Sequence, residues 1–136
     1  YIAGMGFSNV GLGVDHSMAH TLSAYYGTAH GKACAILLPP TLEYNAPASG
    51  EKYREIARAM GVAGVDSMSM DEYRRAAIDA VRSLAHDVGI PENLRGIIKE
   101  EDIPALAESA YADACRPGNP RDVSVSDIEG IFKSLL

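Results

Sequence analysis

The sequence contains little of what several specialised protein classes require. It has no tryptophan, and its only cysteines among 136 residues are Cys34 and Cys115, with no Cys-x-x-Cys pattern. A disulfide framework is therefore not expected, and both thiols are predicted to stay reduced, as in a cytoplasmic protein. A chain of this length can bury a core without such cross-links, so we expect one domain over residues 1–136.

Positive charge and long apolar runs are also scarce. Twelve Lys and Arg residues stand against eighteen Asp and Glu residues, a net charge of -6, and the basic residues form no run. The longest apolar stretches, such as residues 33–38, are too short to cross a bilayer, and no secretory leader is recognisable. We therefore expect neither nucleic acid nor a membrane as a partner.

A phosphate-binding loop is missing as well. The pairs Gly4-x-Gly6 and Gly11-x-Gly13 follow no strand and lack the rest of the dinucleotide fingerprint. The chain is therefore not expected to bind a dinucleotide by itself. It opens at Tyr1 on an apolar segment without a cap, which suggests a part of a longer protein.

Helical periodicity is what the sequence does contain, and no segment alternates like a half-buried strand. Helices are expected over residues 6–25, 31–45, 50–60, 70–88 and 103–115 and after Ser124, with side-chain caps from Thr28, Ser49, Ser69, Asp102 and Ser124. Pro39 and Pro40 predict a kink or a break near Leu38. The predicted fold is all-α, a bundle of six or seven helices.

Three of the four histidines lie close together in the sequence. A helix over residues 6–25 would place five residues on one polar stripe: Asn9, Gly13, His16, His20 and Ser23. Two imidazoles one turn apart suit a shared cation, although histidines buried in a core remain the alternative. His30 is expected in the first turn of the next helix, where the neutral, metal-binding imidazole is favoured. His86 is expected to be solvated.

The motifs resemble the C-terminal half of the iron-containing (group III) alcohol dehydrogenases. The resemblance covers essentially the whole chain and is carried by residues 4–14, 16–20, 30–31, 35–39, 44–45, 52–57, 88–91, 101–107 and 119–121. Residues 50–54 and 101–107 are similar to the branch that interconverts lactaldehyde and 1,2-propanediol, although butanol and 1,3-propanediol dehydrogenases share most motifs. The resemblance implies the helical domain of a dehydroquinate synthase-like fold, with an NAD(P)-binding domain upstream of Tyr1.

The resemblance also implies roles for individual residues. His16 and His30 match two ligands of a divalent ion, typically Fe2+, whose other ligands, an Asp and a His, would lie upstream. His20 matches a further active-site histidine near the nicotinamide, which suits a proton relay better than a ligand. Cys115 matches a region that approaches the cofactor, and a buried structural thiol is its alternative. Asp15, which departs from the apolar residue common in the family, points about 100° away from His16 and is not expected to be a ligand.

The implied function is the interconversion of a small alcohol and an aldehyde by hydride transfer with NAD(P), with the metal as Lewis acid. A homo-oligomer is expected. Two alternatives stay open: a zinc-dependent relative of glycerol dehydrogenase, which differs mainly in its metal, and a helical interaction domain without catalysis. Because two ligands hold an ion weakly, the isolated chain is expected to be metal-poor and inactive.

Overall fold

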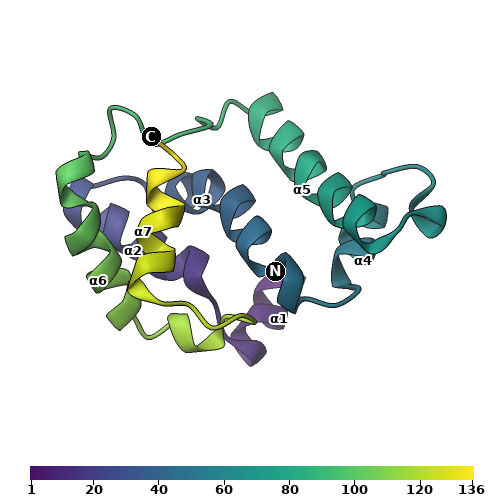
Figure 1. The fold of residues 1–136 in the computed structure, drawn as a ribbon, viewed down its shortest axis with the longest axis horizontal. Helices are drawn as coiled ribbons and strands as arrows, with labels where there is room; N and C mark the ends of the chain where they lie inside the picture. The colour runs from purple at the N-terminus through teal and green to yellow at the C-terminus, as the bar shows by residue number, and fades with distance from the viewer.

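The computed structural model describes residues 1–136 and confirms an all-α fold of seven helices (Figure 1). The helices are α1 (Ile2–Val10), α2 (Val14–Tyr26), α3 (His30–Asn45), α4 (Lys52–Ala59), α5 (Met70–Asp87), α6 (Ile103–Ala112) and α7 (Val125–Lys133). Four short 3-10 helices lie in the connections: η1 (Ala46–Ala48), η2 (Val65–Ser67), η3 (Glu100–Asp102) and η4 (Arg116–Gly118). None of the helices combines the length and the apolar character that a membrane span requires.

Two hydrophobic cores hold the helices together. The larger core lies among α2, α3, α6 and α7 and contains the fully buried side chains of Met18, Leu37 and Phe132. The smaller core joins α4 to α5 through Tyr53 and Tyr73. Because α3 packs against both α2 and α5, it connects the two cores, as Figure 1 shows.

The predicted helix over residues 6–25 is wrong in one respect, because the structure divides it into α1 and α2. Gly11 has a φ of 82°, a left-handed conformation that interrupts the helix and favours glycine. The η4 loop packs directly onto this break, since a Cβ atom added to Gly118 would lie 2.1 Å from the carbonyl oxygen of Leu12. A contact between segments this far apart in the chain explains why local periodicity did not predict the break.

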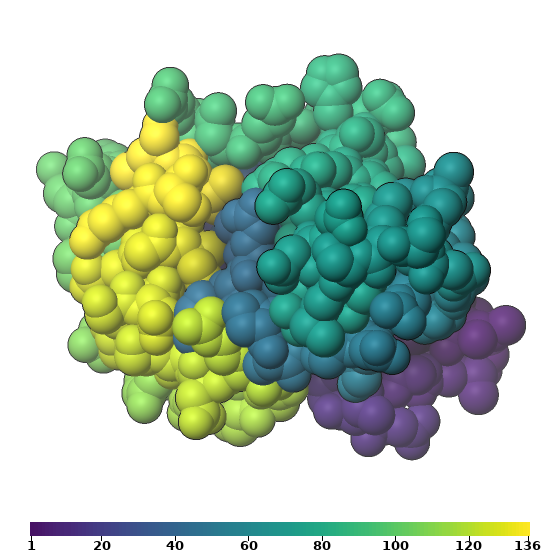
Figure 2. All heavy atoms as spheres, turned by 45° about the vertical axis from the view of Figure 1, so that its right-hand side comes forward, coloured from purple at the N-terminus to yellow at the C-terminus, as the bar shows by residue number.

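The first helix lies on the surface of the molecule. Although its sequence is apolar, α1 contains no buried residue and exposes most of Ile2 and Val10. Figure 2 shows the first residues of the chain standing out at the edge of the molecule. Asn9 consequently leaves the predicted polar stripe, and its amide donates to the carbonyl of Met5 within α1.

The predicted caps are confirmed at two helices only. Ser69 with Glu72 and Ser124 with Asp127 form complete capping boxes at the starts of α5 and α7. The predicted side-chain caps that the structure lacks are those of Thr28, Ser49 and Asp102. Two of these side chains form other hydrogen bonds instead: Ser49 donates to the carbonyl of Asn45, and Asp102 accepts from Tyr26.

The prolines do not break α3, which runs from His30 to Asn45. The hydroxyl of Thr41 donates to the carbonyls of Leu37 and Leu38 at 2.9 and 3.0 Å, beside Pro39 and Pro40. Packing of α3 against α2 and α5 holds the helix together where propensity alone favours an end. The continuous helix carries His30 at its first turn toward α2.

Candidate metal centre

The structure brings the three predicted histidines together at the junction of α2 and α3. His16 and His20 lie one turn apart on α2, and His30 is the first residue of α3. The ring centroids of His16 and His30 are 5.4 Å apart, and those of His20 and His30 are 5.2 Å apart. Two helices thus direct three imidazoles at one small volume, which no single helix could do.

The chemistry of this donor set suits a divalent cation. Ligand atoms of His16, His30 and Cys34 all lie within 4.8 Å of one another, so one ion can reach all three. Burial and the neighbouring His30 and His20 hold the pKa of His16 below its usual value. The neutral imidazole that results is the form that binds metals, so these residues fit a bound ion.

His20 is held by a residue that the sequence did not point to. Its Nδ1 atom lies 2.9 Å from Oδ2 of Asp113, which immediately follows α6. Burial alone would raise the pKa of Asp113, but hydrogen bonds from the backbone N–H of Cys115 and from His20 lower it below its usual value. The ionised carboxylate accepts a hydrogen bond from Nδ1–H of His20, which leaves the lone pair on Nε2 free.

Cys115 lies next to the pair formed by His20 and Asp113. It was predicted to lie on a helix, but it follows the end of α6. The expected helix over residues 103–115 ends at Ala112, because the residues that follow turn toward α2. The thiol of Cys115 and ligand atoms of His20 and Asp113 lie within 4.8 Å of one another. Burial and the carboxylate of Asp113 raise the pKa of this thiol.

A second carboxyl, that of Asp15, lies beside His16 and Cys34. Burial raises the pKa of Asp15 to about 7, against the hydrogen bonds from Cys34 and Thr41 that lower it. The Oδ2 atom of Asp15 is 3.6 Å from Nδ1 of His16, outside hydrogen-bonding distance. Burial and Asp15 in turn raise the pKa of the Cys34 thiol to about 12. Asp15 is therefore a neighbour of both His16 and Cys34, and it is not among the grouped ligand atoms of His16, His30 and Cys34.

The loop that contains Asn119 fixes the start of the helix that carries His16. The Oδ1 atom of Asn119 accepts hydrogen bonds from the backbone N–H of Val14 and the side chain of Asn45 at 3.2 and 3.0 Å. Its amide donates back to Oδ1 of Asn45 at 2.8 Å. A Cβ atom on Gly13 would lie 2.8 Å from the same oxygen. Asn119 thus serves as an N-cap supplied from a distant loop, which positions the histidines of α2.

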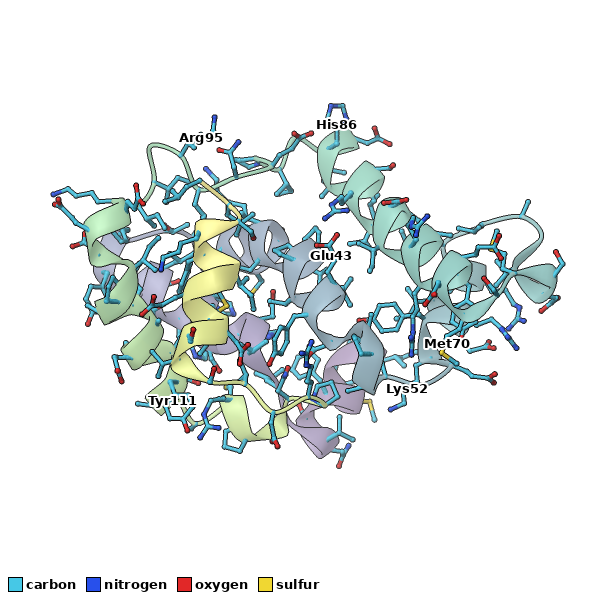
Figure 3. All side chains as sticks on the ribbon, viewed as in Figure 1. Glu43, Lys52, Met70, His86, Arg95 and Tyr111 are labelled. Atoms are coloured by element: carbon cyan, nitrogen blue, oxygen red, sulfur yellow. The ribbon has the colours of Figure 1, made fainter.

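His86 takes no part in the centre. It lies at the end of α5, where Figure 3 shows it pointing away from the bundle, and it is exposed as predicted.

Of the residues near the centre, Cys34 and Asp113 were not predicted. The four-residue spacing of His30 and Cys34 on α3 was a sequence signal for Cys34, as informative as the spacing of His16 and His20. No local signal pointed to Asp113.

Comparisons with known proteins agree with this architecture. The model of the "Fe-containing alcohol dehydrogenase family, C-terminal" matches residues 1–136. Lactaldehyde reductase of Escherichia coli (strain K12) is 56% identical over 133 residues, which are 97% of this chain and 35% of that protein. The 1,3-propanediol dehydrogenase of Citrobacter freundii is 41% identical over 136 residues, 99% of this chain and 35% of that protein.

A solved structure shares the fold. The alcohol dehydrogenase from Oenococcus oeni superposes with a TM-score of 0.93 at 41% identity, over 98% of this chain and 35% of that one. The chain thus spans about a third of the length of the relatives it matches. The match over its full length and the identity to these relatives confirm the resemblance seen in the motifs: the chain belongs to the Fe-containing alcohol dehydrogenase family, as the C-terminal part of the fold.

Proposed function

We propose that this chain forms the metal-binding half of an active site that interconverts a small alcohol and its aldehyde or ketone with NAD(P). The observation that carries the proposal is the convergence of His16 and His30 from two helices, with ring centroids 5.4 Å apart. Membership of an iron-containing alcohol dehydrogenase family supports Fe2+ as the ion. The remaining protein ligands, an Asp and a His in the family's pattern, would come from sequence upstream of Tyr1.

When bound, a divalent ion would supply a positive charge that stabilises the substrate oxygen, and a nicotinamide would supply hydride chemistry. His16 and His30 would hold the ion. Their neutral state, favoured for His16 by burial and by the two other imidazoles, keeps their lone pairs available.

His20 would move the proton of the alcohol. Its Nδ1 atom is hydrogen-bonded to Asp113, so its Nε2 atom can accept a proton without any change in ring orientation. Its ring stacks on that of His30, which keeps it beside the ion that the latter would hold. His20 and Cys115 are proposed as this chain's contacts with the cofactor, because their polar atoms lie together beside the histidine cluster.

The relatives suggest the substrate class. A lactaldehyde reductase and a 1,3-propanediol dehydrogenase are among the proteins most similar to this chain, and both names refer to small three-carbon compounds. We propose a short-chain alcohol or diol and its carbonyl counterpart as substrates of the whole protein.

Metal content of the full-length protein tests the proposal. We expect His16→Ala and His30→Ala to lose bound metal and activity together, because each removes one imidazole from a shared ion. His86→Ala is the matched control, since this histidine is exposed at the end of α5. Stoichiometric metal retained by both His16→Ala and His30→Ala would contradict the assignment.

A zinc-dependent enzyme of the same reaction class is the second candidate. The observation that favours it is the thiol of Cys34 within reach of His16 and His30. Sulfur ligands suit zinc better than Fe2+. The metal recovered with the protein after expression with both ions available distinguishes the two candidates.

A further inference from the structure

Asn119 lies in the loop after α6 and contacts the start of α2, two residues before His16. We propose that Asn119 is a positioning residue for the metal site: through Val14 and Gly13 it fixes the place of His16, and it thereby sets the affinity of the site for its ion. The inference rests on the proposed function, because it takes His16 as a ligand. It goes beyond that proposal in giving a functional role to a residue that does not touch the ion.

The start of α2 depends on this loop for its cap. Its N-cap residue is Gly13, which has no side chain that could accept a hydrogen bond. The backbone N–H of Val14 instead donates to Oδ1 of Asn119 at 3.2 Å. Because the first N–H groups of a helix have no partner within the helix, this bond holds the first turn, which contains His16. A ligating side chain must be held to within about 0.5 Å, so a frayed first turn would weaken the binding of an ion.

Gly13 allows Asn119 to come this close. A Cβ atom on Gly13 would lie 2.8 Å from Oδ1 of Asn119, too close for the two atoms to coexist without a shift. The backbone of Gly13, with φ -139° and ψ -160°, is extended, a conformation that other residues adopt. Glycine is therefore needed here for space, and the missing side chain and the amide of Asn119 form one contact.

Asn119 is itself held from α3. Its side chain and that of Asn45, the last residue of α3, exchange two hydrogen bonds of 3.0 and 2.8 Å. Its amide also donates to the carbonyl of Arg121 at 2.7 Å, and Arg121 donates to the carbonyl of Tyr44 at 2.8 Å and lies over the Tyr44 ring. The cap of α2 is thus tied to the helix that carries the second proposed ligand, His30.

The Fe2+ affinity of the full-length protein tests this role. It is measured without oxygen, by competition between the metal-free protein and a chromophoric chelator. We expect Asn119→Ala to weaken Fe2+ binding by about 10- to 100-fold, the scale on which residues that orient metal ligands act. Ser69→Ala is the matched control, because it removes the N-cap of α5, a helix that carries no proposed site residue. Its Fe2+ affinity should equal that of the wild type.

Gly13→Ala tests the same contact from the side of α2. The added methyl group should weaken Fe2+ binding in the wild-type background, because it displaces the oxygen of Asn119. In the Asn119→Ala background it should have a much smaller effect, since the oxygen that it would meet is gone. Losses that simply multiply in the double variant would overturn the direct contact.

The outcomes separate this inference from the proposed function. Wild-type Fe2+ affinity in Asn119→Ala, while His16→Ala loses the metal, would overturn the positioning role and leave the histidine site intact. An equal loss in Ser69→Ala would overturn it as well, because reduced stability would then explain both. Fe2+ binding that is unaffected by His16→Ala and His30→Ala would overturn the proposed function and this inference together. Circular dichroism checks that each variant is folded, and Gly13→Ala decides in the same way if Asn119→Ala is not.

Discussion

The Nδ1 atom of His20 lies 2.9 Å from Oδ2 of Asp113, a residue 93 positions further along the chain. This contact joins the middle of α2 to the end of α6 and fixes both the orientation of the imidazole and the nitrogen that carries its proton. The carboxylate is itself held by the backbone N–H of Cys115 at 2.8 Å. Asp113 is thus a positioning residue for His20, which acts on the substrate in the proposed mechanism.

Asp113→Asn should lower kcat by about 10- to 100-fold and change KM much less, because a misoriented imidazole loses part of the roughly 100- to 10,000-fold that a positioned acid–base group contributes. An amide that donates its N–H to Nδ1 holds the opposite tautomer of His20 and removes the charge that stabilises the imidazolium. Steady-state kinetics of the full-length enzyme measure the effect. Asp87→Asn is the control, since it alters an exposed His–Asp pair at His86. A wild-type kcat for Asp113→Asn would contradict the role.

Two glycine substitutions should have opposite effects on stability. Gly118 lies in close contact with Leu12, whereas Gly130 has no neighbour that an added methyl group would meet. Gly118→Ala would place a Cβ atom 2.1 Å from a backbone oxygen, so we expect it to lower the free energy of unfolding by about 1–3 kcal/mol or more. Gly130→Ala adds a methyl group on the solvent-exposed side of α7 with nothing within 4 Å and should raise stability by up to about 1 kcal/mol. Urea unfolding measures both. Equal effects of the two substitutions would contradict the close approach.

Asp15 predicts a pH dependence of stability in the metal-free protein. Its pKa is about 7 in the folded state, against 3.8 for an unperturbed aspartate side chain, so the folded protein binds this proton more tightly than the unfolded chain does. The stabilisation from this group is therefore complete below pH 4 and is lost as the pH rises to about 7.

Asp15→Asn lacks this titration, so the variant should gain stability relative to the wild type between pH 4 and pH 7. The gain should be about 4 kcal/mol at most, from the difference between the two pKa values. Denaturant unfolding at a series of pH values measures it, and the titrating groups that lie away from Asp15 cancel in the difference between the two proteins. A difference that stays constant or shrinks with rising pH would contradict the buried, protonated carboxyl.

Much of the fold was predictable because its signals are local. The capping boxes at Ser69 and Ser124 each need only a hydroxyl and a carboxylate three residues apart, and both form as predicted. The apolar periodicity of α5, α6 and α7 predicted helices close to their observed positions. The cap expected from Asp102 failed for the opposite reason: the carboxylate of Asp102 at the start of α6 binds Tyr26 from a distant helix.

For the candidate centre, the sequence by itself determined which residues are available and on which face they lie. The spacing of His16 and His20 follows from the helical repeat, and the position of His30 follows from the short turn after α2. The motifs that surround them were sufficient to predict the family.

Only the tertiary structure decided which atoms meet. The break at Gly11 depends on the η4 loop packing onto Leu12, the orientation of His20 depends on Asp113, and the grouping of Cys34 with His16 depends on how α3 crosses α2. Each of these contacts joins segments that are separated in the chain, and their geometry is determined by the packing of the larger core. Periodicity and propensity describe a single helix, so they contain no information about the distance between two helices.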